Sequence, residues 1–260
     1  HTAVNAGICK AFTEGVLSSA TLMANGAAFD EAVHQVKQLD LPTGIHFNLT
    51  SGFPVSAPHK IPTLIQENGT FWSKWKFAKR FLQKKISTKD IQTELSSQIQ
   101  KCLESGIKPD HFDGHHHVHL LPRIASLIFN LLRPVTVKYR SVSLPLLVSW
   151  TLSPLSAIQQ TAFNRLNYKR YAADFATPDH FAGMELLNNP DKDKTITRLL
   201  KHLKPGITEL MCHPGYLVPQ PISIYNQGRE QELDILSGPS IKETLKSHNI
   251  TVISYRDLPA

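Results

Sequence analysis

The chain has 260 residues, which is enough for one large domain with a substantial buried core. Its 41% hydrophobic and 19% charged residues are ordinary for a globular protein and argue against a disordered chain. It has no apolar run of about 18 residues, so we expect no membrane span.

The net charge of +7 could attract nucleic acid. Much of the excess lies in "KWKFAKRFLQKK" (74–85), where we expect a solvated helix face. The alternative is a sugar-binding or phosphate-binding rim that includes Trp72 and Trp75.

Cysteine use and the first residues bear on where the protein works. Cys9, Cys102 and Cys212 share no metal-type spacing, and any disulfide leaves one of them over, which fits a reducing, cytoplasmic compartment. The chain starts at "HTAVNAGICKAF", without Met or a signal-like stretch, and enters a helix at once. We therefore expect a sequence that begins partway through a longer protein.

In chain order, the first predicted elements are a strand over 18–24, a helix over 28–39 and a strand over 44–49. A long helix follows from Ser87, which forms a capping-box-like pair with Asp90. Its apolar positions recur at helical spacing, and Gly106 marks its end; they are Ile91, Leu95, Ile99, Cys102 and Leu103.

The second half repeats the alternation of strand and helix. Strands are predicted over 111–115, 135–140, 207–212 and 250–255. Helices are predicted from Pro122 and over 191–203, and two more around 228–248. Residues 145–190 are expected to form helices and an irregular loop that elaborate the substrate side. This order predicts parallel strands joined by right-handed crossovers. We expect a single α/β domain over 1–260 that resembles a (β/α) TIM barrel, although six strands are one or two short of closure.

Histidine and aspartate residues follow three of the predicted strands. His46 ends the second strand, Asp113 and His115 end the third, and His213 follows 207–212. The carboxyl ends of barrel strands carry the active site, and imidazole and carboxylate are ligands for divalent ions. A lone histidine such as His34 would more often be a surface residue, so the prediction depends on the combination.

The stretch "DHFDGHHHVHLLP" (110–122) places four histidines within five positions. If 111–117 stays extended, Asp113, His115 and His117 share one face and His116 faces away. His119 could join them only if the chain turns first. We therefore expect His115 to be the ligand and Asp113 to orient it or hold a proton. A tract that scavenges metal without a specific site is the weaker alternative.

Four motifs in the same order resemble the YdjC-type carbohydrate deacetylases, the group that includes chitooligosaccharide deacetylases. They are "TGIHFNLTSGFPVS", "KPDHFDGHHHVHLLP", "TELMCHPGY" and "GREQELDIL", and the likeness extends to "VNAGICKAFTEGVLSSATLMANG" near the start. The resemblance implies a barrel-like fold and metal-assisted removal of the N-acetyl group from acetylated amino sugars. It places metal ligands at His46 and His115 and the "HPGY" histidine at His213.

In the mechanism that the resemblance implies, the metal polarises water and the acetamide, a carboxylate accepts the proton of the water, and His213 protonates the departing amine. Magnesium is the favoured ion and zinc the alternative. Arg140, Tyr216, Asp179 and His119 are candidate substrate contacts.

The family opens with a strand ending in "NADDFG", which supplies a metal ligand and a base, and this sequence has no Asp-Asp pair. We expect a fragment that lacks this strand and is inactive as it stands.

Three alternatives remain open at this point. One is a metal-dependent hydrolase of another acetylated glycan or glycolipid on the same fold. Another is a non-catalytic sugar-binding relative, which the missing aspartates favour. The third is a basic nucleic-acid-binding module, which would leave the histidines without a role, so we expect no nucleic-acid partner. The sugar, its linkage and the oligomeric state, a homo-oligomer included, are not determined by the sequence.

Overall fold

The computed structural model describes residues 1–135, 137–139, 144–145, 158, 175–187, 189–218 and 225–258. The chain forms two compact units. The first, here called the terminal unit, comprises residues 1–20, 38–42 and 140–260. The second, here called the histidine unit, comprises residues 21–37 and 43–139 and contains the four-histidine run. The single domain expected from the sequence stays a prediction.

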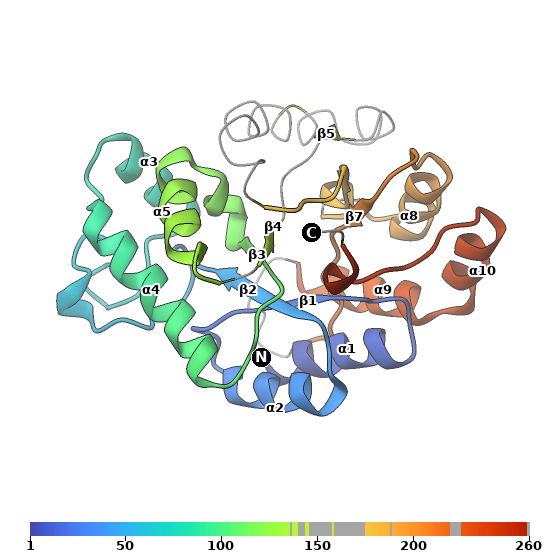
Figure 1. Cartoon of the computed structure of the whole chain (residues 1–260), viewed down its shortest axis with the longest axis horizontal. Coiled ribbons are helices and arrows are strands. Elements are labelled where there is room, and N and C mark those ends of the chain that lie inside the picture. The colour runs from blue at the N-terminus through green and yellow to red at the C-terminus, as the bar shows by residue number, and fades with distance from the viewer. Residues whose placement is uncertain are drawn as a thin grey trace. The chain divides into compact units, whose positions relative to one another are not determined.

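The histidine unit is built on a sheet of four short strands in the order β1-β2-β3-β4 (Figure 1). These strands are β1 (Ala20–Leu22), β2 (Thr43–Phe47), β3 (His111–Gly114) and β4 (Lys138–Tyr139). β2 is parallel to β3, and β3 is parallel to β4. The register pairs His46 with Asp113. Two residues predicted to share a site are therefore neighbours across the sheet.

Side chains of β2 and β3 form the core of this unit. Phe47 and Phe112 are fully buried and meet edge to face with their ring centroids 6.1 Å apart, and Phe112 meets Phe129 in the same way. The two strands run close together at Gly44, where a Cβ would lie 2.4 Å from the carbonyl oxygen of His111. Only glycine fits at this position, so Gly44 allows the two strands that carry the site to lie this close together.

Helices surround the sheet of the histidine unit. They are α2 (Phe29–Leu39), α3 (Lys74–Leu82), α4 (Thr88–Glu104) and α5 (Pro122–Leu132), with short 3₁₀ turns at η1 (Pro58–Lys60) and η2 (His115–Leu120). α4 packs on β2 and on α5, as Figure 1 shows. The predicted start of α5 at Pro122 is confirmed.

The structure confirms the predicted α4 and corrects two of its details. Ser87 caps the helix by accepting from the backbone N–H of Asp90, and Gly106 follows it at φ +79°. The Asp90 carboxylate, however, accepts from the backbone N–H and the hydroxyl of Thr63. Its first-turn carboxylate thus ties a loop to the helix. Leu103, predicted on the apolar face, is 42% exposed.

A buried polar network fastens the loop after β2 to α4. Glu94, which is fully buried, accepts from the backbone N–H groups of Val55 and Ser56 at 3.0 and 2.9 Å. Gln98 accepts from the N–H of Asn48 and donates to its carbonyl. Buried polar groups stabilise a fold when all are satisfied, so two side chains of α4 hold the course of residues 48–56.

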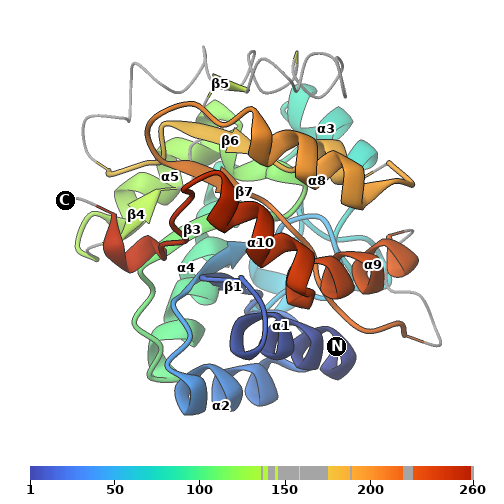
Figure 2. The ribbon, with the colours of Figure 1, turned by 90° about the vertical axis from the view of Figure 1, so that its right-hand side faces the viewer.

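The terminal unit contains a second parallel sheet, in the order β5-β6-β7. Its strands are β5 (Leu144–Pro145), β6 (His180–Ala182) and β7 (Thr208–Leu210). Its helices are α1 (Thr2–Thr13), α8 (Lys192–Lys201), α9 (Asn226–Ser237) and α10 (Pro239–Ser247), with 3₁₀ turns η3 (Met184–Leu186) and η4 (Tyr255–Asp257). α8, α9 and α10 lie side by side, as Figure 2 shows, and α1 packs on α9. The predicted helix at the start of the chain is confirmed.

The structure does not confirm two predictions about the sheet, a strand over 250–255 and a closed barrel. The strand expected over 250–255 is wrong, because residues 250–254 have no strand structure and lead into η4. Val252 and Ile253 are 44% and 37% exposed, so the alternating pattern is not buried as a strand would require. The TIM barrel is not confirmed either, since the described strands form two separate sheets and neither is closed.

Most of 145–190 lies outside the described residues. None of the helices in the described part of the chain could cross a membrane.

We predict that Glu94→Ala lowers the free energy of unfolding by about 3 kcal/mol, because it leaves two backbone N–H groups without their acceptor. Urea unfolding followed by circular dichroism measures this. Glu104→Ala is the matched control, since Glu104 is exposed at the end of the same helix and its loss should cost less than about 0.5 kcal/mol. Equal losses in the two variants would contradict a structural role for the network.

Candidate functional site

His46 and Asp113 meet at neighbouring positions of β2 and β3. The Nδ1 atom of His46 lies 2.6 Å from Oδ1 of Asp113, whose side chain is 2% exposed. The hydroxyl of Thr21 on β1 donates to Oδ2 of Asp113 at 3.3 Å. A buried carboxylate at Nδ1 favours the tautomer that carries its proton there. The Nε2 lone pair of His46 is then left to bind something else.

His115 lies next to the Nε2 atom of His46. The Nε2 atom of His46 and the Nδ1 atom of His115 are 3.4 Å apart, and the two rings meet edge to face. β3 ends at Gly114, and the chain turns into η2. The condition that 111–117 stays extended is not met, because His116 and His117 take left-handed φ values of 53° and 57°. His117 does not continue the strand face shared by Asp113 and His115.

The two facing nitrogens fit a divalent ion. With metal–nitrogen bonds of about 2.0–2.1 Å, two imidazoles on a tetrahedral ion place their nitrogens about 3.3–3.4 Å apart. A carboxylate behind a metal-binding histidine is the usual means of orienting it. Among the residues that the structure describes, no group of three or more His, Cys, Asp or Glu side chains is placed to hold an ion. The site therefore offers two nitrogen donors, with Asp113 behind one of them.

His116 stands beside the pair and is held as a neutral ring. Thr50 meets its Nδ1 atom at 3.0 Å, and its ring centroid lies 4.0 Å from that of His115. Burial, followed by the charges of Lys74 and His46, lowers the pKa of His116 to about 4. His116 is thus uncharged at neutral pH and adds no positive charge beside His46 and His115. The prediction that it faces away from the site is wrong, because the turn brings it back.

His119 is buried beneath the end of the strand. It is 1% exposed, and a Cβ on Gly114 would lie 2.7 Å from its Nδ1 atom. The turn after Gly114 folds the ring inward, and glycine leaves room for it. The predicted substrate contact at His119 is not supported, because its ring does not reach the surface.

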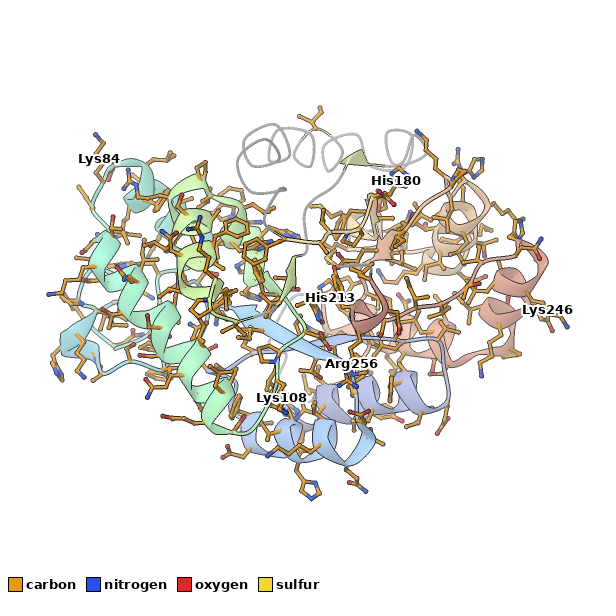
Figure 3. The ribbon with its side chains drawn as sticks, in the orientation of Figure 1. Lys84, Lys108, His180, His213, Lys246 and Arg256 are labelled. Atoms are coloured by element: carbon orange, nitrogen blue, oxygen red, sulfur yellow. The ribbon has the colours of Figure 1, made fainter. Side chains whose placement is uncertain are left out.

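His213 lies in the terminal unit, in the loop that follows β7 (Figure 3). Its backbone N–H donates to Glu232 of α9, and its ring meets the edge of the Tyr225 ring. The loop approaches α1 closely, because a Cβ at Gly7 would lie 2.5 Å from the Cα atom of Gly215. A buried carboxylate and the close approach of Gly7 to Gly215 thus fix the course of the loop that carries His213.

Glu232 is the centre of a buried charged cluster that sequence analysis missed. The hydroxyl of Tyr225 donates to it, and Nζ of Lys192, 4% exposed, lies 3.9 Å away. Burial raises the pKa of Glu232, against the opposing effect of those hydrogen bonds and cations, and burial lowers the pKa of Lys192. In the sequence, the motif "GREQELDIL" supports only the family resemblance. The signal that could have indicated the cluster is the second glutamate of this motif, Glu232, at a helix position next to apolar residues.

The remaining predicted site residues have different settings. Asp179 accepts from the N–H of Ile207 at 2.8 Å, which is a structural role at the start of β7. Tyr216 is 37% exposed and has Nζ of Lys10 6.0 Å from its ring centroid. Arg140 lies outside the described residues. A substrate role for any of them stays a prediction.

The fold and site define an α/β protein with parallel strands and a carboxylate-oriented histidine pair at their carboxyl ends. The chain belongs to the YdjC-like protein family, which matches residues 1–247. It is 32% identical to a carbohydrate deacetylase of Geobacillus stearothermophilus, over 98% of this chain and 91% of that protein. It is 30% identical to one of Brevibacillus brevis, over 98% and 94%, and 26% identical to one of Mus musculus, over 97% and 89%.

A solved structure is also similar. The crystal structure of a protein from Enterococcus faecalis V583, described as a cellobiose-phosphate cleavage protein, superposes with a TM-score of 0.80 at 25% identity. The match covers 98% of this chain and 93% of that one. The likeness in fold therefore extends over nearly the whole length that the two chains share.

We predict that Glu232→Gln changes how stability depends on pH. A carboxyl whose pKa is raised in the folded state contributes stability below its unfolded value, near 4.5, and this contribution is lost as the pH rises through the folded value. The stability of the parent chain relative to Glu232→Gln should therefore be greater at pH 4 than at pH 8, as measured by urea unfolding. Asp234→Asn, at an exposed position of α9, is the control and should show a much smaller change. A parallel pH course for parent and Glu232→Gln would contradict the raised pKa.

Proposed function

We propose that this protein is a carbohydrate deacetylase that removes the N-acetyl group from acetylated amino sugars, with a divalent ion bound by His46 and His115. The observation that carries the proposal is the 3.4 Å approach of the two ring nitrogens, with Asp113 fixed behind His46. Relatives named carbohydrate deacetylase match 98% of the chain, which supports the same chemistry here.

The reaction needs a nucleophilic water, a stabilised oxyanion and a proton for the leaving amine. A bound divalent ion would supply Lewis acidity toward the acetamide carbonyl and the attacking water. Asp113 keeps the proton of His46 on Nδ1, so that the lone pair of Nε2 stays available to bind the ion. The neutral His116 avoids repulsion of the cation. The family resemblance implies a further aspartate ligand and base from a preceding strand.

His213 is proposed as the acid that protonates the departing amine. Histidine suits this role because its unperturbed pKa lies close to neutral pH. Glu232 anchors the loop through the backbone N–H of His213.

The donor set bears on which ion binds. Two imidazoles favour zinc or a similar transition ion, whereas magnesium prefers oxygen ligands. The aspartate that the resemblance implies would add oxygen and make magnesium more favourable. We propose to compare both ions directly by calorimetric titration of the metal-free protein.

A second candidate function is cleavage of another glycan on the same fold. It is favoured by the structural neighbour described as a cellobiose-phosphate cleavage protein. This candidate predicts turnover of a phosphorylated or otherwise modified disaccharide without acetate release. A panel of acetylated, lipid-linked and phosphorylated sugars distinguishes the two functions.

We predict that His115→Ala weakens zinc binding on the order of a hundredfold and removes acetate release, because one of the two nitrogen donors is lost. Calorimetry and an acetate assay on N-acetylated chitooligosaccharides measure the two effects. The chain is tested as it stands and with the family's "NADDFG" strand added at its start. His34→Ala, at an exposed position of α2, is the control. Unchanged metal affinity in His115→Ala would reject the proposed ion site.

We predict that, in the chain with the family's "NADDFG" strand added, His213→Ala lowers kcat by about 10²–10⁴-fold, the usual contribution of general acid catalysis, while metal affinity stays the same. His202→Ala, at an exposed position after α8, should leave kcat unchanged. An unaltered kcat in His213→Ala would reject the proton-donor role and leave the ion site intact.

A further inference from the structure

The whole charge excess of the chain lies in one short segment around α3. Residues 68–89 contain seven lysine and arginine residues and no aspartate or glutamate. The chain has 28 basic and 21 acidic residues, so outside this segment the two kinds are equal in number. Six lysines of the segment are exposed, and they are Lys74, Lys76, Lys79, Lys84, Lys85 and Lys89. So dense a field of one sign attracts an anionic partner.

One face of α3 packs on the histidine unit and holds the helix in place. Phe77 is 1% exposed, and its ring stacks on that of Phe81 with the centroids 5.9 Å apart. The guanidinium of Arg123 on α5 lies 5.3 Å from the centroid of the Phe81 ring. Arg80 lies over the ring of Trp72 at 4.3 Å. These contacts fix the backbone of α3 and do not involve the opposite face of the helix.

The opposite face of α3 presents two large apolar side chains to solvent. Trp75 is 76% exposed and Leu82 is 82% exposed. They are seven residues apart, which is about two turns, so they lie on the same side of the helix, and Phe77 and Phe81 lie on the other. Lys79 lies on their side as well, four residues after the tryptophan. An apolar pair with a basic rim is typical of an interaction surface. Trp75, Leu82 and the six exposed lysines are here called the α3 patch.

The α3 patch lies where an extended surface can reach it. The helix is at the margin of the histidine unit (Figure 1). It ends at Leu82, and the side chain of Lys84 points away from the rest of the unit (Figure 3). Nζ of Lys74 lies 5.3 Å from the centroid of the Trp75 ring, so a positive charge lies beside the exposed indole. The basic and the apolar parts of the patch can therefore contact one partner together.

We propose that the α3 patch docks the protein on the surface of a membrane that contains anionic phospholipids, with Trp75 and Leu82 inserted at the level of the headgroups. Lysines close to such a surface are each attracted to it, and tryptophan favours the boundary between headgroups and acyl chains. Leu82 favours lipid over nucleic acid as the partner, because a leucine gains from apolar burial but offers no ring on which a base could stack. This attachment does not depend on the proposed chemistry at His46 and His115.

The test is sedimentation of the whole chain with vesicles of phosphatidylcholine, alone or with about one-third phosphatidylserine. The parent should bind the mixed vesicles at least about tenfold more tightly than the neutral ones. Trp75→Ala and Leu82→Ala should each weaken binding to the mixed vesicles at least about fivefold, because an inserted apolar side chain is lost. Lys76→Glu combined with Lys79→Glu should weaken it at least about twentyfold, since each lysine near the surface contributes roughly fivefold.

Matched controls separate the α3 patch from general charge and apolarity. Lys201→Glu combined with Lys246→Glu makes the same change of charge at exposed positions of α8 and α10. Leu103→Ala removes an exposed leucine, 42% accessible, near the far end of α4. Both controls should bind the mixed vesicles as the parent does. All variants change exposed side chains, so each should unfold at the urea concentration of the parent.

Insertion is measured separately by tryptophan fluorescence. The emission of the parent should shift to the blue with mixed vesicles and be quenched by lipids brominated in their acyl chains. Both effects should be much smaller in Trp75→Ala when it is saturated with vesicles.

Three results would overturn the proposal. They are equal binding to the two kinds of vesicle, equal losses in the patch variants and their controls, and binding by the parent without a shift in emission. A single-stranded oligonucleotide that displaces the vesicles, with steeply salt-dependent affinity, would overturn the lipid assignment, because the same lysines would then serve nucleic acid.

Discussion

The contact between His46 and Asp113 is the interaction on which the proposed chemistry depends. It spans two parallel strands at paired positions, and its geometry follows from the backbone register. The strands meet closely because Gly44 has no side chain to separate them. With the ring fixed by the carboxylate, the free nitrogen faces His115 across a distance that suits a shared ion. Strand packing, hydrogen-bond register and metal chemistry are thus parts of one arrangement.

Within each unit, buried polar groups fix a loop that carries candidate site residues. Glu94 and Gln98 of α4 fix the loop after β2, and Glu232 of α9 fixes the loop after β7. In each unit a helix carboxylate accepts from the backbone of the loop that carries candidate site residues. A loop held in this way can present side chains precisely without itself becoming part of the core.

Much of this arrangement could be predicted from the sequence. The amphipathic periodicity of α4 and the capping serine fixed its start, and strand ends followed by histidines indicated the candidate ligands. Local pattern could not predict that Asp90 turns to Thr63, since that partner is 27 residues away. Alternation over 250–255 suggested a strand, but a strand also needs a neighbour to pair with. Nothing in the composition of the histidine run indicates left-handed φ at two successive residues, so the turn after Gly114 could not be predicted.

Those two left-handed residues have an energetic consequence. Non-glycine residues in this conformation cost on the order of 1 kcal/mol each, and the folded chain bears that cost at His116 and His117. Other contacts of the folded chain outweigh it, and the hydrogen bond between Thr50 and His116 is one of them. The turn is therefore maintained at the expense of conformational stability.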